Sequence, residues 1–97
     1  METTATPSMK VEVISPESSY TAEVTAVSAR NDTGPFDVLP GHANFITEFK
    51  GLIKLKLVDH SNWEVNPPYG VLRCRNNQVT IYIPAFKSED KSSKLPI

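Results

Sequence analysis

Short runs of alternating hydrophobic and polar residues recur along the chain, and turn-forming residues separate them. The clearest run is 53–57, in which Ile53, Leu55 and Leu57 alternate with two lysines. On a β-strand such alternation sends one set of side chains into a core and the other into water. No window has a sustained apolar period of 3.6 residues, so the pattern favours strands over helices.

The same pattern predicts further short strands, at 10–14, 20–27, 36–39, 44–49, 63–65, 70–75 and 78–83. In the second of these, Ala22, Val24 and Ala26 are expected on one face. The segment 30–35 is rich in turn formers and is expected to be an exposed loop. Asn76-Asn77 is expected to form a hairpin turn, because asparagine tolerates left-handed backbone. Seven or eight short strands at this spacing predict an antiparallel β-sandwich.

A chain of 97 residues suits one domain with a modest core. Residues 1–9 lack a basic segment followed by an apolar run, so we expect a flexible leader and no signal peptide. Residues 86–97 are mostly charged or polar and are expected to form a flexible tail. The folded domain is therefore predicted to cover 10–85.

Charge and composition narrow the possible partners. A net charge of −1 lacks the basic footprint that nucleic-acid binding requires, so no nucleic acid is expected. The apolar stretches are far shorter than the ~20 residues that span a bilayer, so direct membrane insertion is not expected either. Cys74 is the single cysteine, which excludes an intrachain disulfide, and it is predicted to be a small buried strand residue.

The motifs of enzyme chemistry do not appear in the sequence. There is no glycine-rich phosphate loop, nucleophile elbow or metal-spaced set of ligands. We therefore predict no catalytic residue, cofactor, metal site or small-molecule substrate. His42 lies in a Pro-Gly turn and is predicted to be structural, whereas His60, beside Asp59, is predicted to be exposed.

Four basic residues lie on two of the predicted strands: Lys54, Lys56, Arg73 and Arg75. If these strands pair, the four form a basic stripe. Alternation already requires solvated side chains at these positions, so a polar sheet face is the simpler interpretation.

Two segments resemble the ε subunits of F-type ATP synthases. The first comprises 11–17 and 34–43, and its most specific piece is Val-Leu-Pro-Gly-His-Ala at 38–43, because the family has an apolar residue followed by Pro-Gly-His-Ala. The second, 69–81, is similar to the family's Gly-Gly-apolar-Leu-Glu-Val segment and the Asn-x-Val-Thr-Val strand after it. The resemblance covers about 10–85, the part that corresponds to the family's N-terminal β-sandwich.

The resemblance implies a flattened all-β antiparallel sandwich of about 8–10 short strands. It also implies a non-catalytic central-stalk subunit that docks on the γ subunit and the c-ring and couples proton transport to ATP synthesis. Such a subunit is peripheral, on the cytoplasmic face of an energy-transducing membrane. By position in the family, the loops facing the c-ring contain Arg30, Asn31, Asp32, Thr33, Pro35, Phe36 and His42. The positions facing γ are Ser15 and Thr47.

Departures from the family pattern leave other interpretations open. Pro35 stands where the family commonly has a carboxylate, and Asp37 replaces a glycine. The regulatory helical hairpin that follows the sandwich in the family is not expected in a chain ending at Ile97. An alternative is a stand-alone β-sandwich module recruited to another partner. An enzyme would require clustered titratable groups in a cleft, and the sequence shows only scattered ones.

Overall fold

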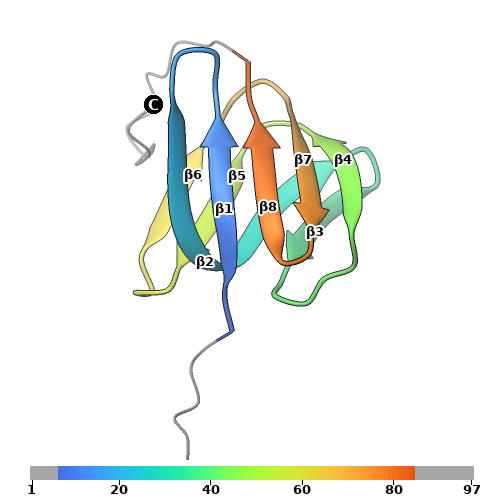
Figure 1. Ribbon diagram of the computed structural model, residues 1–97. Helices are drawn as coiled ribbons and strands as arrows, with labels where there is room; N and C mark the ends of the chain where they lie inside the picture. The colour runs from blue at the N-terminus through green and yellow to red at the C-terminus, as the bar shows by residue number, and fades with distance from the viewer. Residues whose placement is uncertain (1–6, 85–97) are drawn as a thin grey trace, which may run out of the picture.

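The computed structural model describes residues 7–84, and within this range it contains eight strands and no helix (Figure 1). The strands are β1 (Met9–Ile14), β2 (Ser19–Asn31), β3 (Gly34–Val38), β4 (Phe45–Phe49), β5 (Ile53–Leu57), β6 (Asn62–Val65), β7 (Gly70–Arg75) and β8 (Gln78–Tyr82). The predicted tail at 86–97 and most of the predicted leader lie outside the described residues. The all-β prediction is confirmed.

One long strand connects two layers. The strand order is β4-β7-β8-β1-β2-β5-β6, and β3 also pairs with β2. The first half of β2 pairs with β1, whereas its second half pairs with β3 and β5. As a result β3, β5 and β6 lie behind β1, β7 and β8 (Figure 1). Every strand pairing in the described residues is antiparallel except that of β1 with β8, which is parallel, so the predicted antiparallel sandwich holds apart from this pair.

A β-bulge in β2 corrects one prediction. Val24 pairs with Leu57 but Ala26 pairs with Lys56, so β2 carries one extra residue between these positions. The bulge shifts the alternation: Val24 is buried, Ala26 is only half-buried, and Val27 takes the next buried position. A bulge bends a strand and increases its twist, which lets β2 serve both layers.

The expected loop at 30–35 is also corrected. Strand β2 continues to Asn31 and β3 begins at Gly34, which leaves only a two-residue turn, Asp32-Thr33. Pro35 lies inside β3, opposite Arg30. Among the described strands β3 pairs only with β2, and a proline on such an edge strand removes no ladder hydrogen bond from a second neighbour.

The core between the layers is entirely apolar in the described residues. Ile53 and Leu55 are buried and Leu57 is half-buried, as the alternation at 53–57 predicts. Cys74 is completely buried, which confirms its prediction. The largest fully buried side chains include Phe49, Met9, Leu55, Leu72 and Ile81.

The four basic residues do not form one stripe, because their two strands do not pair, which leaves the simpler interpretation of solvated side chains. Strand β5 pairs with β2 and β6, whereas β7 pairs with β4 and β8. Lys54 and Lys56 therefore lie on one layer and Arg73 and Arg75 on the other. No helix in the described residues is long and apolar enough to cross a membrane.

A polar hollow beside the turn between β2 and β3

The residues predicted to face the c-ring follow one side of the sandwich. This side consists of the end of β2, strand β3 and the loop that leads to β4 (Figure 1). The end of β2 contributes Arg30 and Asn31, and the turn contributes Asp32 and Thr33. Pro35 and Phe36 lie in β3, and His42 lies in the loop before β4.

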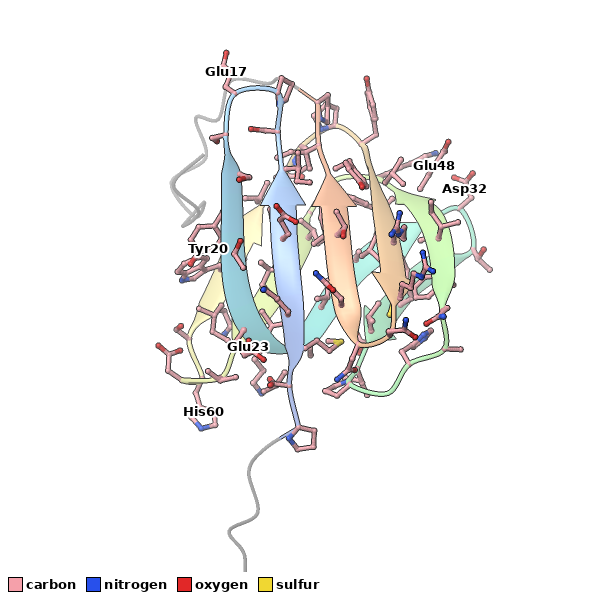
Figure 2. All side chains as sticks on the ribbon, in the orientation of Figure 1. Glu17, Tyr20, Glu23, Asp32, Glu48 and His60 are labelled. Carbon is pink, nitrogen blue, oxygen red and sulfur yellow. The ribbon has the colours of Figure 1, made fainter. Side chains whose placement is uncertain are left out.

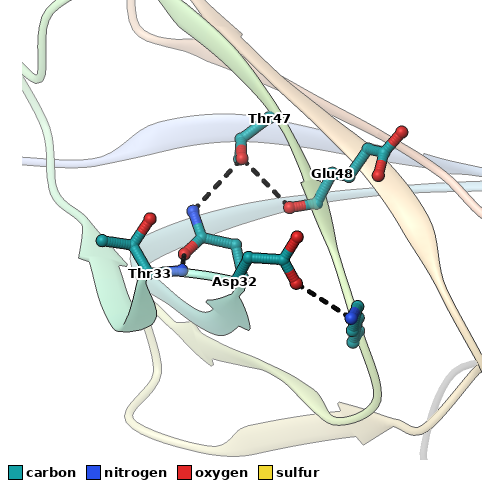
Figure 3. A network of polar contacts seen from close by, with 6 residues as sticks. Asp32, Thr33, Thr47 and Glu48 are labelled. Carbon is teal, nitrogen blue, oxygen red and sulfur yellow. Dashed lines mark hydrogen bonds and ion pairs between the residues drawn. The ribbon is translucent and has the colours of Figure 1, made fainter.

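A hollow of about 230 Å³ opens where the β2–β3 turn meets β4, and six polar residues line it: Asn31, Asp32, Thr33, Thr47, Glu48 and Lys50. Figure 3 shows their contacts. The side-chain amide of Asn31 donates to Thr47 Oγ1 at 3.2 Å, and its carbonyl oxygen accepts from the Thr33 backbone N–H at 2.8 Å. Thr47 Oγ1 in turn donates to the carbonyl of Glu48 at 3.0 Å. The turn is thus hydrogen-bonded to β4.

An ion pair closes the outer side of this hollow. Lys50 Nζ lies 2.8 Å from Asp32 Oδ1, and the Lys50 backbone N–H donates to the carbonyl of Arg30 at 2.9 Å. The hydrogen bond and the charge of Lys50 lower the pKa of the Asp32 carboxyl, and the same contacts raise the pKa of Lys50. Both side chains are well exposed, so the pair contributes little to stability. It joins the turn to the residue that follows β4 and leaves both charged groups accessible.

Aromatic side chains support the other end of this side. Phe36 packs edge-to-face on Phe45 with ring centroids 6.3 Å apart, and the ring of His42 lies 4.7 Å from that of Phe45. Phe36 is half-buried against the core, so much of its side chain supports the fold. His42 is exposed, and its Nδ1 lies 2.9 Å from the carbonyl of Ala43.

The two positions predicted to face γ lie at different places in the same layer. Ser15 follows β1, where its hydroxyl contacts the carbonyl of Ser18 at 3.1 Å. Thr47 lies on β4, three strand spacings away, which corresponds to about 14 Å. The cross-strand row Ile14, Tyr82, Val71, Glu48 runs between them. A partner that contacts both must therefore span most of this layer.

The histidine that was predicted to be exposed lies away from the polar hollow. His60 lies far from Asp32 and Glu48, at the opposite corner of the molecule (Figure 2). It is exposed, as predicted. No three His, Cys, Asp or Glu residues of the described chain are grouped to hold a metal.

Sequence reasoning missed Lys50 and Glu48 as members of the hollow. In the sequence these two residues stand just before Gly51, a turn former, and that position did not indicate which loop they would meet. The fold and this side of it define a β-sandwich domain with a polar contact surface.

Comparison with known families identifies the domain. The sequence profile described as "ATP synthase, Delta/Epsilon chain, beta-sandwich domain" matches residues 8–88. The chain belongs to this family, which confirms the resemblance found in the sequence. A curated relative, the ATP synthase epsilon chain of Geotalea daltonii, is 32% identical, and the match covers 86% of this chain and 61% of the relative. The chain thus spans about three fifths of the length of that relative.

Two solved assemblies contain chains of the same fold. One is the Euglena gracilis mitochondrial ATP synthase, described as OSCP/F1/c-ring in rotational state 1, with a TM-score of 0.74, 14% identity, and coverage of 86% of this chain and 54% of that chain. The other is the central stalk/c-ring of the Tetrahymena thermophila mitochondrial ATP synthase, with a TM-score of 0.69, 13% identity, and coverage of 84% and 67%. At these identities the similarity concerns the fold alone.

Proposed function

We propose that this chain is a central-stalk ε subunit of a rotary ATP synthase. It docks on the γ subunit and the c-ring, couples proton transport through the c-ring to ATP synthesis, and contributes no catalytic residue. Its partners hold it at the cytoplasmic face of an energy-transducing membrane. Family membership over residues 8–88 supports this proposal, as does the origin of two structural neighbours in assemblies whose descriptions name a c-ring.

The observation that carries the proposal is the direct contact between the β2–β3 turn and β4. The turn contains residues predicted to face the c-ring, and β4 contains Thr47, predicted to face γ. Asn31 donates to Thr47, and Lys50 both donates to the Arg30 carbonyl and pairs with Asp32. A load applied at the turn therefore reaches β4 through short polar contacts. Close packing of the core makes the domain stiff enough to transmit it.

Each partner then has its own surface, and the two surfaces meet at the polar hollow, which Asp32 and Thr47 both line. The c-ring contacts the side that runs from Asp32 past Phe36 to His42. The γ subunit spans the end of the other layer, from Ser15 to Thr47.

A charge swap tests the c-ring contact. The variants are Asp32→Lys, Lys50→Asp and the double variant, which restores an ion pair of opposite polarity. We expect Asp32→Lys to lower ATP-driven proton pumping in inverted vesicles, because it reverses a charge that the partner meets. The double variant stays defective if Asp32 contacts a partner, whereas it recovers if Asp32 acts only on Lys50.

The matched control exchanges the pair Lys54 and Glu64, which lie 3.7 Å apart on β5 and β6, away from the proposed surfaces. Its swap should leave pumping unchanged. If all three Asp32 and Lys50 variants pump protons and assemble at wild-type levels, the c-ring contact is removed from the proposal. Co-purification with γ and c subunits tests the wider function, and a different stable partner in their place would favour the stand-alone module.

A further inference from the structure

The outer face of β4, β7 and β8 carries two arginines without an acidic partner. Arg73 and Arg75 are exposed, and neither forms an ion pair with a described residue. Across β8, Arg73 lies opposite Thr80 and Arg75 opposite Gln78. Lys10 lies on the other side of Gln78. Three cations therefore share this face with neutral residues between them.

We call the two arginines the Arg73–Arg75 ridge. Two shallow hollows lie beside it. The first, of about 280 Å³, is polar, and its lining adds Asn76, Gln78 and Thr80 to the two arginines. The second, of about 380 Å³, lies on the side of β4, and Phe45 and Ile46 contribute to its lining. Ile46 is 64% exposed, the largest fraction among the exposed large hydrophobic residues. The ridge thus has hydrogen-bonding groups on one side and apolar surface on the other.

The acidic residues nearest to the ridge form no ion pair with its arginines in the described part of the chain. Glu12 lies opposite Thr80 on β1, two strand spacings or about 10 Å from Arg73. Glu48 shares a row with Val71, the next outward residue of β7. Neither forms an ion pair with an arginine. The whole chain has a net charge of −1, so the ridge is a local basic surface on a slightly acidic protein.

We propose that the Arg73–Arg75 ridge binds an acidic amphipathic helix of a partner protein. Outward residues two apart on a strand are about 6.6–7 Å from each other. Carboxylates at i and i+4 on a helix have Cβ atoms about 5–6 Å apart, so two of them reach both arginines. Each guanidinium pairs with a carboxylate in two-pronged geometry, which favours arginine over lysine at such contacts.

The apolar hollow selects a protein over other anions. A leucine-sized side chain on the same face of the helix covers Ile46 and part of Phe45 while the carboxylates meet the arginines. A nucleic acid satisfies the cations but leaves that apolar surface exposed to water, whereas an amphipathic helix covers both parts of the ridge. The two hollows at the ridge share no lining residue with the polar hollow beside the β2–β3 turn, so the two sites are distinct. The inference stands without the proposed function.

The test uses the full chain and a synthetic end-capped, alanine-rich helical peptide. The peptide carries two glutamates at i and i+4 and a leucine on the same face. Two-dimensional ¹H–¹⁵N NMR titration should give shift changes confined to β4, β7, β8 and Lys10, and they should weaken with added salt. Replacing both glutamates by glutamine should weaken binding about tenfold or more.

Protein variants test whether peptide binding depends on the two arginines of the ridge or on any pair of exposed basic residues. Arg73→Gln/Arg75→Gln should abolish the shifts, whereas the matched control Lys54→Gln/Lys56→Gln, on the other layer, should bind the peptide as the wild type does. Equal binding of the glutamine peptide, shifts elsewhere on the chain, or binding that survives loss of both arginines would overturn the proposal. Arginine-dependent binding to phosphatidylglycerol vesicles without binding to the peptide would also overturn it and assign the ridge to a membrane.

Discussion

Gly70 begins β7 at a point where the chain has no room for a methyl group. A Cβ built on Gly70 would lie 2.5 and 2.6 Å from two ring carbons of Phe49 and 2.6 Å from the carbonyl oxygen of Tyr82. Ordinary contact begins at 3.4 Å, so the ring would have to retreat by about 0.9 Å. Phe49 is completely buried, and the carbonyl belongs to β8, so neither neighbour moves without disturbing the core or the sheet.

Gly70→Ala should therefore destabilise the domain by about 1–3 kcal/mol, the usual range for overpacking. Urea unfolding followed by tryptophan fluorescence measures this loss as a lower midpoint with an unchanged slope. A loss of 2 kcal/mol shifts the midpoint by about 1 M urea when the slope is about 2 kcal/mol per M. The single tryptophan, Trp63, reports on β6 and packs against Tyr20, with the ring centroids 4.3 Å apart and the rings tilted by 45°.

A double-mutant cycle identifies the cause. Phe49→Leu removes the ring atoms that face Gly70 and should itself be destabilising, because it leaves a cavity. In the double variant the new methyl group occupies part of that cavity. The combined loss should be smaller than the sum of the single losses by about 0.5–3 kcal/mol. Additive losses, or a Gly70→Ala variant within about 0.5 kcal/mol of wild type, would refute the steric argument.

Two further predictions concern the β7–β8 turn and the buried thiol. Asn77 has φ 66°, accepts from the Gly41 N–H at 2.8 Å and donates to the Ser8 carbonyl at 3.0 Å. Asn77→Gly should lower the free energy of unfolding by about 1–2 kcal/mol, because the two hydrogen bonds are lost. Asn77→Ala should lower it further, because alanine also resists positive φ. Equal urea midpoints for the two variants would contradict this. Burial raises the pKa of the Cys74 thiol above its ordinary range, so the unfolded thiol ionises first and the free energy of unfolding should fall as the pH rises through and above that range. Cys74→Ala should flatten this fall, and an unchanged slope would contradict it.

The strands were predictable because alternation is a local signal. Ile53 and Leu55 are buried beside exposed lysines, as the alternation at 53–57 predicts. Asn76 and Asn77 both have positive φ, as expected for asparagines in a hairpin turn. The bulge in β2 was not predictable, because Thr25 and Ala26 offer little contrast in polarity where the alternation shifts. The turn formers at 30–35 predicted a longer loop than the structure contains, because a proline such as Pro35 can also lie in an edge strand.

The contacts of the candidate site were beyond the sequence for a different reason. Asn31 and Thr47 are 16 residues apart, and their hydrogen bond exists only because β4 and the end of β2 meet. Positions assigned by resemblance indicate which residues to consider but not which of them touch. The structure joins three residues predicted to face the c-ring with one predicted to face γ in a single hollow. The identity of the partner at each position remains a prediction.

The bend of β2 explains how a short turn acquires rigidity. The first half of β2 belongs to the layer of β1, and its second half belongs to the layer of β5. The end of β2 then meets β4, the last strand of the first layer, through Asn31 and the Arg30 carbonyl. The Asp32-Thr33 turn is therefore attached to the first layer twice, covalently through β2 and by hydrogen bonds through β4. A contact made at this turn displaces both layers together, which is the mechanical property that the proposed coupling role requires.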